Sequence, residues 1–267
     1  MADQKLYHYT SRGGLLGMVN SKSLWLTHMM YMNDAVEYQY GLDMVIKILK
    51  EQYDNNLASQ LIDAVERNKE IPSIFSFSLS ENKDTLSQWR GYCPNGGYSI
   101  SFDEALLKES IAANANTTLR KCVYTVEEIV AIVKEDIVRM TPEAYFEQRE
   151  LEKTRGTSKP LSGLPYELIS RAYQHIPYIK NPAFHEEKEW RIVVAEHHEK
   201  PFRYTDNVQF REGKSSLIPF VVMDLKDKTI NEAIISPTLD EELAIQACKK
   251  LIGINEVSAS EIPYRNW

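Results

Sequence analysis

The sequence contains few cysteines, and those present lie far apart. Among 267 residues there are three, Cys93, Cys122 and Cys248, and no two of them form a C-x-x-C pair. Disulfide frameworks and zinc knuckles need closely and regularly spaced cysteines, so neither is expected. The default environment for such a chain is a reducing one, and we expect a cytoplasmic protein.

Long apolar runs and targeting signals are also lacking. No stretch of about 18 apolar residues is present, so no membrane-spanning helix is predicted. The first ten residues do not combine a basic segment with a following apolar one, which argues against a secretory signal.

Basic charge is scarce, as are familiar catalytic motifs. Lysine and arginine number 31 against 38 aspartates and glutamates, which gives a formal net charge of −7. This acidic balance argues against general nucleic-acid binding, although it does not exclude a local basic patch. The sequence has no H-E-x-x-H, no G-x-S-x-G and no P-loop, and His197-His198 has no third ligand at a readable spacing, so no metal site is predicted.

The composition, 43% hydrophobic and 26% charged, is that of a globular protein with one sizeable core or two small ones. Alternation of polar and apolar residues predicts strands at 5–10, 24–27, 74–80, 98–103, 187–195, 217–225 and 233–236. Helical periodicity predicts a helix from about residue 34 to 70, a mostly helical segment at about 125–180 and a final helix at 240–252. We predict a single α+β domain over 1–267, with a mixed or antiparallel sheet and a helical insertion at about 125–180.

The strand predicted at 187–195 has the most unusual pattern. In an extended strand Glu187, Glu189, Arg191 and Val193 share one face, while the alternate residues form an apolar face. Carboxylates held this close repel each other, which raises one pKa or requires a cationic partner such as Arg191. A solvated edge strand is the structural alternative, and it stays open at this point.

Other polar and aromatic side chains gather in three segments. His8 lies between two tyrosines in the first predicted strand, and Ser76, Ser78 and Ser80 form a polar face on another. Trp89 follows in a predicted polar loop at 81–97. Each has a simple structural explanation: a hydrogen-bonded histidine, solvent-exposed serines and a tryptophan at the edge of the core.

The order of four segments resembles the domain-of-unknown-function 2971 family of bacterial and phage proteins, often found in accessory or defence-type gene contexts. The segments are KLYHYTS, SLWLTHMMYMNDAVEY, FSFSLSENKDTLSQWRGYCPNGGYSISFD and FHEEKEWRIV. Asn33, Asp34 and Glu37, the Trp89 loop and the E-x-E-x-R row carry the resemblance as a set. Within it, Asp34 and Glu37 fit a capping box that starts the long helix. This family name implies no activity.

A second resemblance concerns chemistry. A first strand with His8, a central strand with Ser76 or Ser78, and a late strand with Glu187 and Glu189 follow the order found in ADP-ribosyltransferase domains. This resemblance implies an ADP-ribosyltransferase-like sheet, NAD as the substrate and an unidentified macromolecular acceptor. It favours an ADP-ribosyltransferase or NAD glycohydrolase, of the kind found among defence and toxin effectors.

The same resemblance implies roles for individual residues. Glu189 would accept a hydrogen bond from the nicotinamide-ribose 2′-OH, and Glu187 would orient or deprotonate an acceptor. His8 and Thr10 would contact the adenosine ribose and the phosphates. The aromatic side chain that stacks on nicotinamide would be one of Tyr9, Tyr38 and Trp89, and Ser76, Ser78 and Arg191 complete the expected NAD-binding set.

Two alternatives remain. Glu186-Glu187-Lys188 contains an E-x-K pair, which on a strand can combine a metal ligand with a lysine, as in a metal-dependent nuclease with Asp34 or Asp103 as the further acid. The phase of the strand disfavours this, because Glu186 and Lys188 fall on the apolar face. A non-enzymatic module that binds a nucleotide or a protein is the other alternative.

Overall fold

The structure is a computed structural model, and it describes residues 5–32, 36–52, 73–114, 116–137, 150–151, 154, 174–196, 207–213, 215–237 and 240–263. Within these residues ten strands form one sheet. They are β1 (Tyr7–Ser11), β2 (Ser23–His28), β3 (Ser73–Ser80), β4 (Gly97–Phe102), β5 (Thr117–Lys121), β6 (Glu189–Glu196), β7 (Gln209–Glu212), β8 (Leu217–Asp224), β9 (Ile230–Ile235) and β10 (Val257–Ala259).

The sheet is mixed and branches at β3. One edge of β3 pairs with β6 along its full length, and β6 pairs in turn with β5. The other edge is shared: the end of β3 pairs with β1 at Tyr7↔Ser80, and its beginning pairs with β2 at Thr27↔Ser76. From there the sheet continues through β4, β9 and β10 on one side and through β8 and β7 on the other. Only the β9–β10 pair is parallel among the described strands, so the predicted α+β class with a mixed sheet is confirmed.

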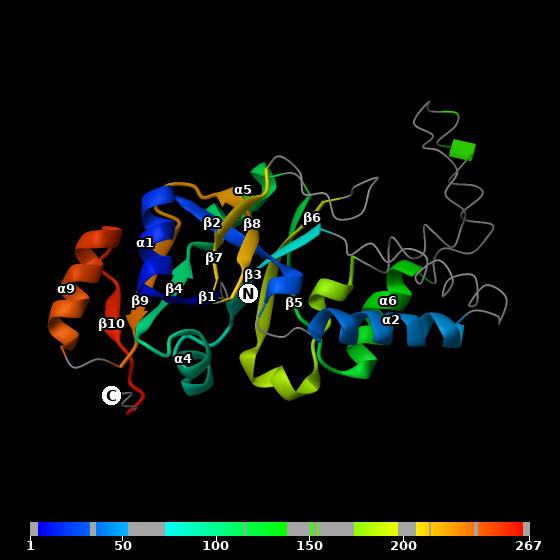
Figure 1. The fold of residues 1–267 in the computed structure, drawn as a ribbon, viewed down its shortest axis with the longest axis horizontal. Coiled ribbons are helices and arrows are strands. Elements are labelled where there is room, and N and C mark those ends of the chain that lie inside the picture. Colours follow the sequence, from blue (N-terminus) through cyan, green and yellow to red (C-terminus); the bar gives the residue numbers. More distant parts are fainter. Residues whose placement is uncertain are drawn as a thin grey trace.

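The described helices are α1 (Arg12–Ser21), α2 (Glu37–Gln52), α4 (Leu86–Tyr92), α5 (Glu104–Ala113), α6 (Val126–Ile137) and α9 (Glu241–Ile252). Some helices lie at the two ends of the molecule, and α4 and α5 lie nearer its middle (Figure 1). Helices α2 and α6 lie together at one end of the molecule, and α9 with β10 lies at the other. Three short 3-10 turns complete the described elements: η1 (Met29–Tyr31), η2 (Ile176–Tyr178) and η3 (Pro182–Glu187).

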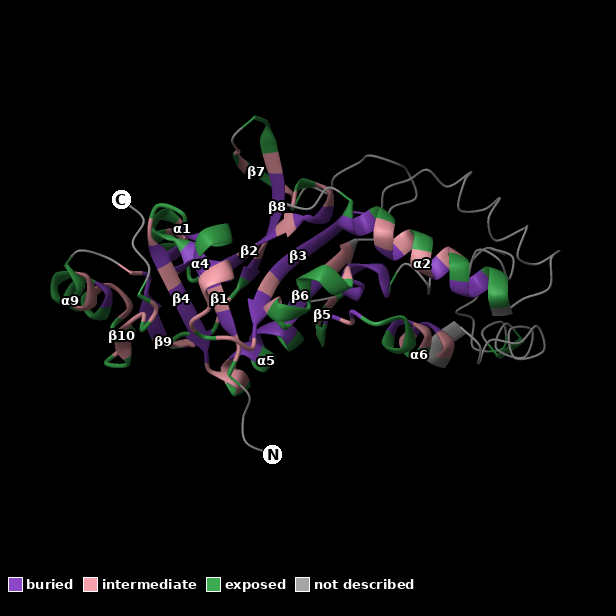
Figure 2. Ribbon diagram, turned by 90° about the horizontal axis from the view of Figure 1, so that it is seen from below, coloured by how far each residue is buried: buried purple, intermediate pink, exposed green. Residues whose placement is uncertain are grey.

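The central strands are buried over much of their length (Figure 2), and apolar clusters lie on both faces of the sheet. On one face, Val193 of β6 and Ile74 of β3 pack with α2, α6 and η2. On the opposite face, Ile192 and Phe77 belong to a larger cluster with α1, α5 and α9. Burying such a side chain contributes about 1.5–3 kcal/mol, so these two layers account for most of the stabilisation of the fold.

The strand that carries the glutamates is shorter than predicted. β6 begins at Glu189, and Glu187 instead ends the 3-10 turn η3. The turn forms because the Asn181 side chain caps it and Pro182 occupies its first position, and it ends where Lys188 adopts a left-handed backbone with φ 42°. The prediction that Glu187 lies on the strand was therefore wrong.

Other elements differ from the pattern of the sequence. Part of the predicted polar loop at 81–97 forms α4, and β4 is separated from β3 by β1, although both lie in one sheet as predicted. The long helix is present as α2, whereas its predicted continuation to residue 70 lies outside the described residues. Asp34 and most of the predicted helical insertion also lie outside them.

The three cysteines are buried free thiols, which agrees with the predicted absence of a disulfide framework. In the described part of the chain, no helix is long and apolar enough to cross a membrane.

Candidate functional site

The register between β3 and β6 brings the serine row beside the charged row. Ser80 lies opposite Glu189, and Ser78 lies opposite Arg191. Directly opposed residues project to the same face, so these polar side chains share one surface of the sheet. Because β6 lies between β3 and β5, and Glu189 and Arg191 are 3% and 0% exposed, the solvated-edge interpretation is wrong.

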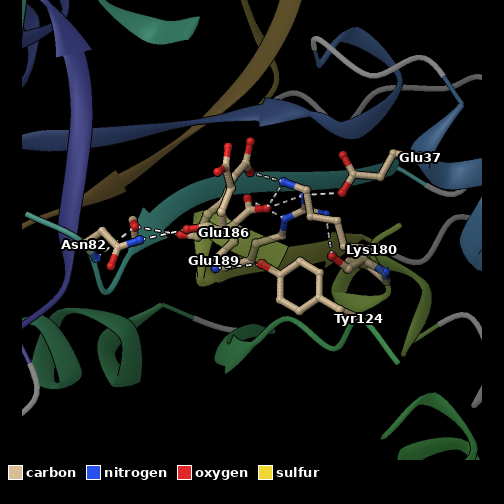
Figure 3. A network of polar contacts seen from close by, with 10 residues as sticks. Glu37, Asn82, Tyr124, Lys180, Glu186 and Glu189 are labelled. Carbon is tan, nitrogen blue, oxygen red and sulfur yellow. Dashed lines mark hydrogen bonds and ion pairs between the residues drawn. The ribbon is translucent and has the colours of Figure 1, made fainter. Parts of the chain in front are cut away.

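Arg191 is the centre of a buried ion-pair network, of which Glu37, Lys180 and Glu189 are labelled in Figure 3. Its Nε donates to Glu189 Oε1 at 2.8 Å, and its Nη2 donates to Glu189 Oε2 at 2.9 Å. Nη1 donates to the Pro177 carbonyl at 2.7 Å, and Nη2 also contacts the Glu37 carboxylate at the start of α2. A two-point contact of this kind fixes the plane of the Glu189 carboxylate as well as its charge. Arg191 was predicted to contact NAD, but it is enclosed and instead holds Glu189.

Lys180 joins a second carboxylate to this network. Its Nζ contacts Oε2 of Glu187 and Oε2 of Glu189. In addition, the Glu189 backbone N–H donates to the Tyr124 hydroxyl at 2.8 Å, which fixes the first residue of β6 from the other side. The two glutamates predicted to work together are therefore close together, although Glu187 reaches this place from η3.

The two carboxylates have different electrostatic environments. Burial by itself raises the pKa of Glu189, but Arg191 and Lys180 outweigh burial and lower this pKa to about 2. For Glu187 burial dominates over the attraction of Lys180, so its pKa is raised above the ordinary value. Environments that push two pKa values apart are typical of pairs in which one carboxylate stays ionised and the other exchanges a proton.

The backbone of η3 is fixed to the end of β3. The Ser80 hydroxyl donates to the Glu187 carbonyl at 2.7 Å, and the Asn82 side chain donates to the Glu186 carbonyl at 2.8 Å. The Asn82 backbone N–H donates in turn to the Ser80 hydroxyl at 3.0 Å. The serine row is thus used structurally at Ser80, where it places Glu187 above the sheet.

A pocket of about 310 Å³ opens beside this network. Glu187 and Glu189 form one of its walls, and α4 contributes Gln88 and Tyr92. The remaining lining residues come from β1 and the end of β3: Tyr7, His8, Tyr9, Ser78, Leu79 and Ser80. Five of the residues predicted from the sequence therefore meet in one pocket: His8, Tyr9, Ser78, Glu187 and Glu189.

His8 sits where β1 and β3 diverge. Its ring stacks on Phe77 at a centroid distance of 4.0 Å, and its Nδ1 lies 2.8 Å from the Ser78 carbonyl oxygen. Because a carbonyl oxygen only accepts, Nδ1 is the donor and Nε2 carries the lone pair of the neutral ring. Burial lowers the pKa of His8 to about 4, so the ring is uncharged at neutral pH.

The remaining predicted site residues do not line the pocket. Thr10 packs against the start of α1, where a Cβ on Gly14 would lie 2.1 Å from its Oγ1. Ser76 is buried opposite Val193, and Tyr38 of α2 belongs to the core.

Trp89 also belongs to the interior. It is 1% exposed, its Nε1 donates to Asp84 at 2.6 Å, and its ring meets Tyr9 edge-on at 4.9 Å. A ring enclosed in this way cannot stack on a ligand, so its structural explanation holds.

Several residues at the site were missed from the sequence. Lys180 lies seven residues before Glu187, and no periodicity links the two because a turn separates them. Glu37 was interpreted as part of a helix cap, whereas its carboxylate pairs with Arg191. Gln88 and Tyr92 belong to the predicted polar loop at 81–97 that contains Trp89, and a helical period of four residues places both on the same side of α4.

The structure weakens the basis of the nuclease alternative. Glu186 and Lys188 are both exposed, and neither lies on a strand. The described residues contain no group of three or more histidine, cysteine, aspartate or glutamate side chains suited to hold a metal ion.

Comparison with known proteins finds a match to a family model. Residues 88–192 match the model of the family described as Protein of unknown function (DUF2971), which supports the resemblance drawn from the sequence. The matched region includes Trp89, Tyr92, Lys180, Glu189 and Arg191. No curated protein and no solved structure matches the chain.

Proposed function

We propose that this protein consumes NAD, as an ADP-ribosyltransferase or an NAD glycohydrolase, at the pocket formed by β1, β3, α4 and η3. The observation that carries the proposal is the pair of unequal carboxylates in the wall of the pocket. Their cluster contains Glu37, Glu187 and Glu189 against Lys180 and Arg191, three negative charges against two positive ones. One formal negative charge is therefore left beside the pocket.

An excess negative charge suits the cleavage of the nicotinamide–ribose bond. As the C–N bond breaks, its electron pair leaves with nicotinamide and positive charge develops on the ribose ring. A carboxylate that is already ionised and fixed in place stabilises this charge without reorganising. Glu189 meets both conditions, because Arg191 fixes its plane and its pKa is about 2.

Glu189 keeps capacity for a substrate contact. A carboxylate has about four lone-pair positions. In the described residues, Arg191 and Lys180 use two on Oε2, and Arg191 uses one on Oε1. The remaining position on Oε1 can accept one hydrogen bond, the number that a ribose 2′-OH requires.

Other pocket residues take roles that fit their surroundings. Tyr92 is 37% exposed and lines the pocket, so we assign it the stacking contact with nicotinamide that the resemblance implied for Tyr9, Tyr38 or Trp89. His8 is neutral, so we assign it no charge contact with the phosphates; its ring lies against Phe77, on the face of the sheet opposite the Glu189 carboxylate.

The volume of the pocket limits what it encloses. Its empty space of about 310 Å³ includes the open solvent at its mouth, so it does not enclose a whole dinucleotide. We expect it to take nicotinamide and the attached ribose, with the adenosine half outside. The three buried unpaired thiols suit a reducing environment, and we place the reaction in the cytoplasm.

The test is the release of nicotinamide from NAD by the purified protein, followed by chromatography. Wild-type protein should release nicotinamide, and Glu189→Gln should lower the rate by about 10²-fold or more, the loss typical when one charge-stabilising group is removed. Glu186→Gln is the matched control, because this exposed glutamate lies one residue from Glu187 and should leave the rate unchanged.

The outcomes separate the alternatives. Absence of nicotinamide release from a folded wild-type protein refutes the proposal, and an NAD-induced thermal shift without release would favour a non-enzymatic binding module. Equal release by wild type and Glu189→Gln would refute the role of Glu189. A thermal melt of each variant shows whether a lost rate reflects lost folding.

A further inference from the structure

Lys180 occupies a position between the two glutamates that neither resemblance assigns to any residue. It lies between η2 and η3, and its backbone N–H donates to the Val123 carbonyl at 3.0 Å, which fixes the segment. Its side chain is 6% exposed and ends at the two carboxylates. The ammonium group therefore enters the network from a segment separate from β6.

The two glutamates depend on Lys180 to different extents. Glu189 is already held at both oxygens by Arg191. For Glu187, Lys180 is the cation in contact among the residues that the structure describes. Removing Lys180 would leave Glu189 paired, and it would leave the Glu187 carboxylate facing another carboxylate without a positive charge between them.

We propose that Lys180 is a positioning residue that keeps the Glu187 carboxylate ionised and turned toward Glu189 and the pocket. This proposal rests on the proposed function, because it makes Glu187 the proton acceptor of the reaction. When the hydroxyl of water or of an acceptor attacks the anomeric carbon, the new C–O bond forms as the C–N bond breaks. The electron pair of the C–N bond leaves with nicotinamide, and the hydroxyl proton passes to Glu187.

Charged and titratable groups from every neighbouring element bear on Glu187. Glu189 of β6 and Glu37 of α2 raise its pKa, in addition to burial, and Lys180 lowers it. Arg191 is committed to Glu189 and Glu37. Tyr92 of α4 is neutral, because burial and then the glutamates raise its own pKa. Among these groups, removal of Lys180 should therefore change the pKa of Glu187 the most.

The experiment measures the titration of Glu187 without any substrate. In protein labelled with ¹³C at the glutamate carboxyl, the Glu187 signal is identified by its loss in Glu187→Gln. Lys180→Met keeps most of the aliphatic stem and removes the charge, so the midpoint of Glu187 should rise by about one pH unit or more. Lys180→Arg keeps the charge and should return the midpoint toward the wild-type value. An unchanged midpoint in folded Lys180→Met overturns the proposal.

A second measurement covers the case in which Lys180→Met does not fold. In wild-type protein the ¹⁵N signal of Lys180 Nζ should shift with the same midpoint as Glu187, and Glu187→Gln should abolish this transition. If the ¹⁵N signal of Lys180 does not shift at the Glu187 midpoint, the proposal is contradicted.

Kinetics then connect the titration to the reaction. The acidic limb of the pH–rate profile for nicotinamide release should move upward in Lys180→Met by the same amount as the Glu187 midpoint. A limb that stays in place while the midpoint moves overturns the assignment of Glu187 as proton acceptor. If wild type releases no nicotinamide, the proposed function fails, and the two titrations still decide whether Lys180 controls the charge of Glu187.

Discussion

Replacing Arg191 by methionine tests how far the site depends on its buried charges. Arg191 is fully buried. It donates through Nε to Glu189, through Nη1 to the Pro177 carbonyl and through Nη2 to Glu37 and Glu189. Methionine fills much of the same volume but donates nothing. The substitution removes the Arg191 partner of Glu37, and among the described residues Glu189 then keeps its ion pair with Lys180. Removing one partner of a buried ion pair costs about 3–5 kcal/mol, because the other charge stays desolvated.

The expected loss is measurable by urea denaturation and by thermal melting at pH 7. At about 2–4 °C per kcal/mol for a chain approaching this size, the melting temperature of Arg191→Met should fall by roughly 6–20 °C. Arg120→Met is the matched control. Arg120 lies opposite Arg191 on β5 but is exposed, and its contact with the Tyr178 ring, 5.4 Å from the centroid, predicts a loss of about 1 kcal/mol or less.

The pH dependence sharpens this prediction. The lowered pKa of Glu189 stabilises the folded protein above the ordinary glutamate pKa of 4.5, and this stabilisation is lost as the pH falls toward about 2. The difference in unfolding free energy between wild type and Arg191→Met should therefore be full at pH 7 and smaller at pH 3. Equal stability of the two proteins at pH 7, or a difference that grows on acidification, would refute the assignment of Arg191 as the partner of an ionised Glu189.

Two further predictions concern residues around the pocket. Desolvation lowers the pKa values of His8 and His28 to about 4, so each stabilises the fold fully above the ordinary histidine value of 6.5, and this contribution is lost between pH 6.5 and 4. His8→Gln should flatten the fall in urea-unfolding free energy over this range, and an unchanged slope would contradict a half-buried His8 that stays neutral. Asp84 accepts hydrogen bonds from Trp89 Nε1 and from the Glu261 backbone N–H at 2.8 Å. Asp84→Ala should lower the free energy of unfolding by about 1–3 kcal/mol and speed hydrogen exchange at the Glu261 amide. Unchanged exchange would show that Asp84 does not hold the segment around Glu261.

The alternation of residues predicted most strands well. In β3 and β6 the serines and the charged residues project to one face, together with Ile74 and Val193, whereas Phe77 and Ile192 project to the other. Pattern alone did not distinguish an exposed charged face from a buried one. Glu189 and Arg191 are tolerated in the interior because cations and carboxylates from α2 and the segment before η3 complete their pairing. Of these partners, Glu37 lies far from β6 in the sequence, and no periodicity links Lys180 to the strand.

The boundary of β6 shows a second limit of the sequence. The E-x-E spacing suggested one continuous strand, but the Asn181 cap and Pro182 favour a 3-10 turn up to Glu187. Local turn chemistry overrode alternation there. The two glutamates still meet, because Ser80 and Asn82 fix the turn to the end of β3 and Lys180 draws both carboxylates together.

The sequence by itself determined the α+β class, the order of most elements and which residue types would meet near β1, β3 and β6. It also identified His8, Tyr9, Ser78, Glu187 and Glu189, which line one pocket. Only the tertiary structure decided which polar residues face that pocket and which are enclosed, because burial and ion pairing depend on every element packed around a side chain. For this reason only the structure showed that Arg191 pairs with Glu189 and that Lys180 contacts both glutamates.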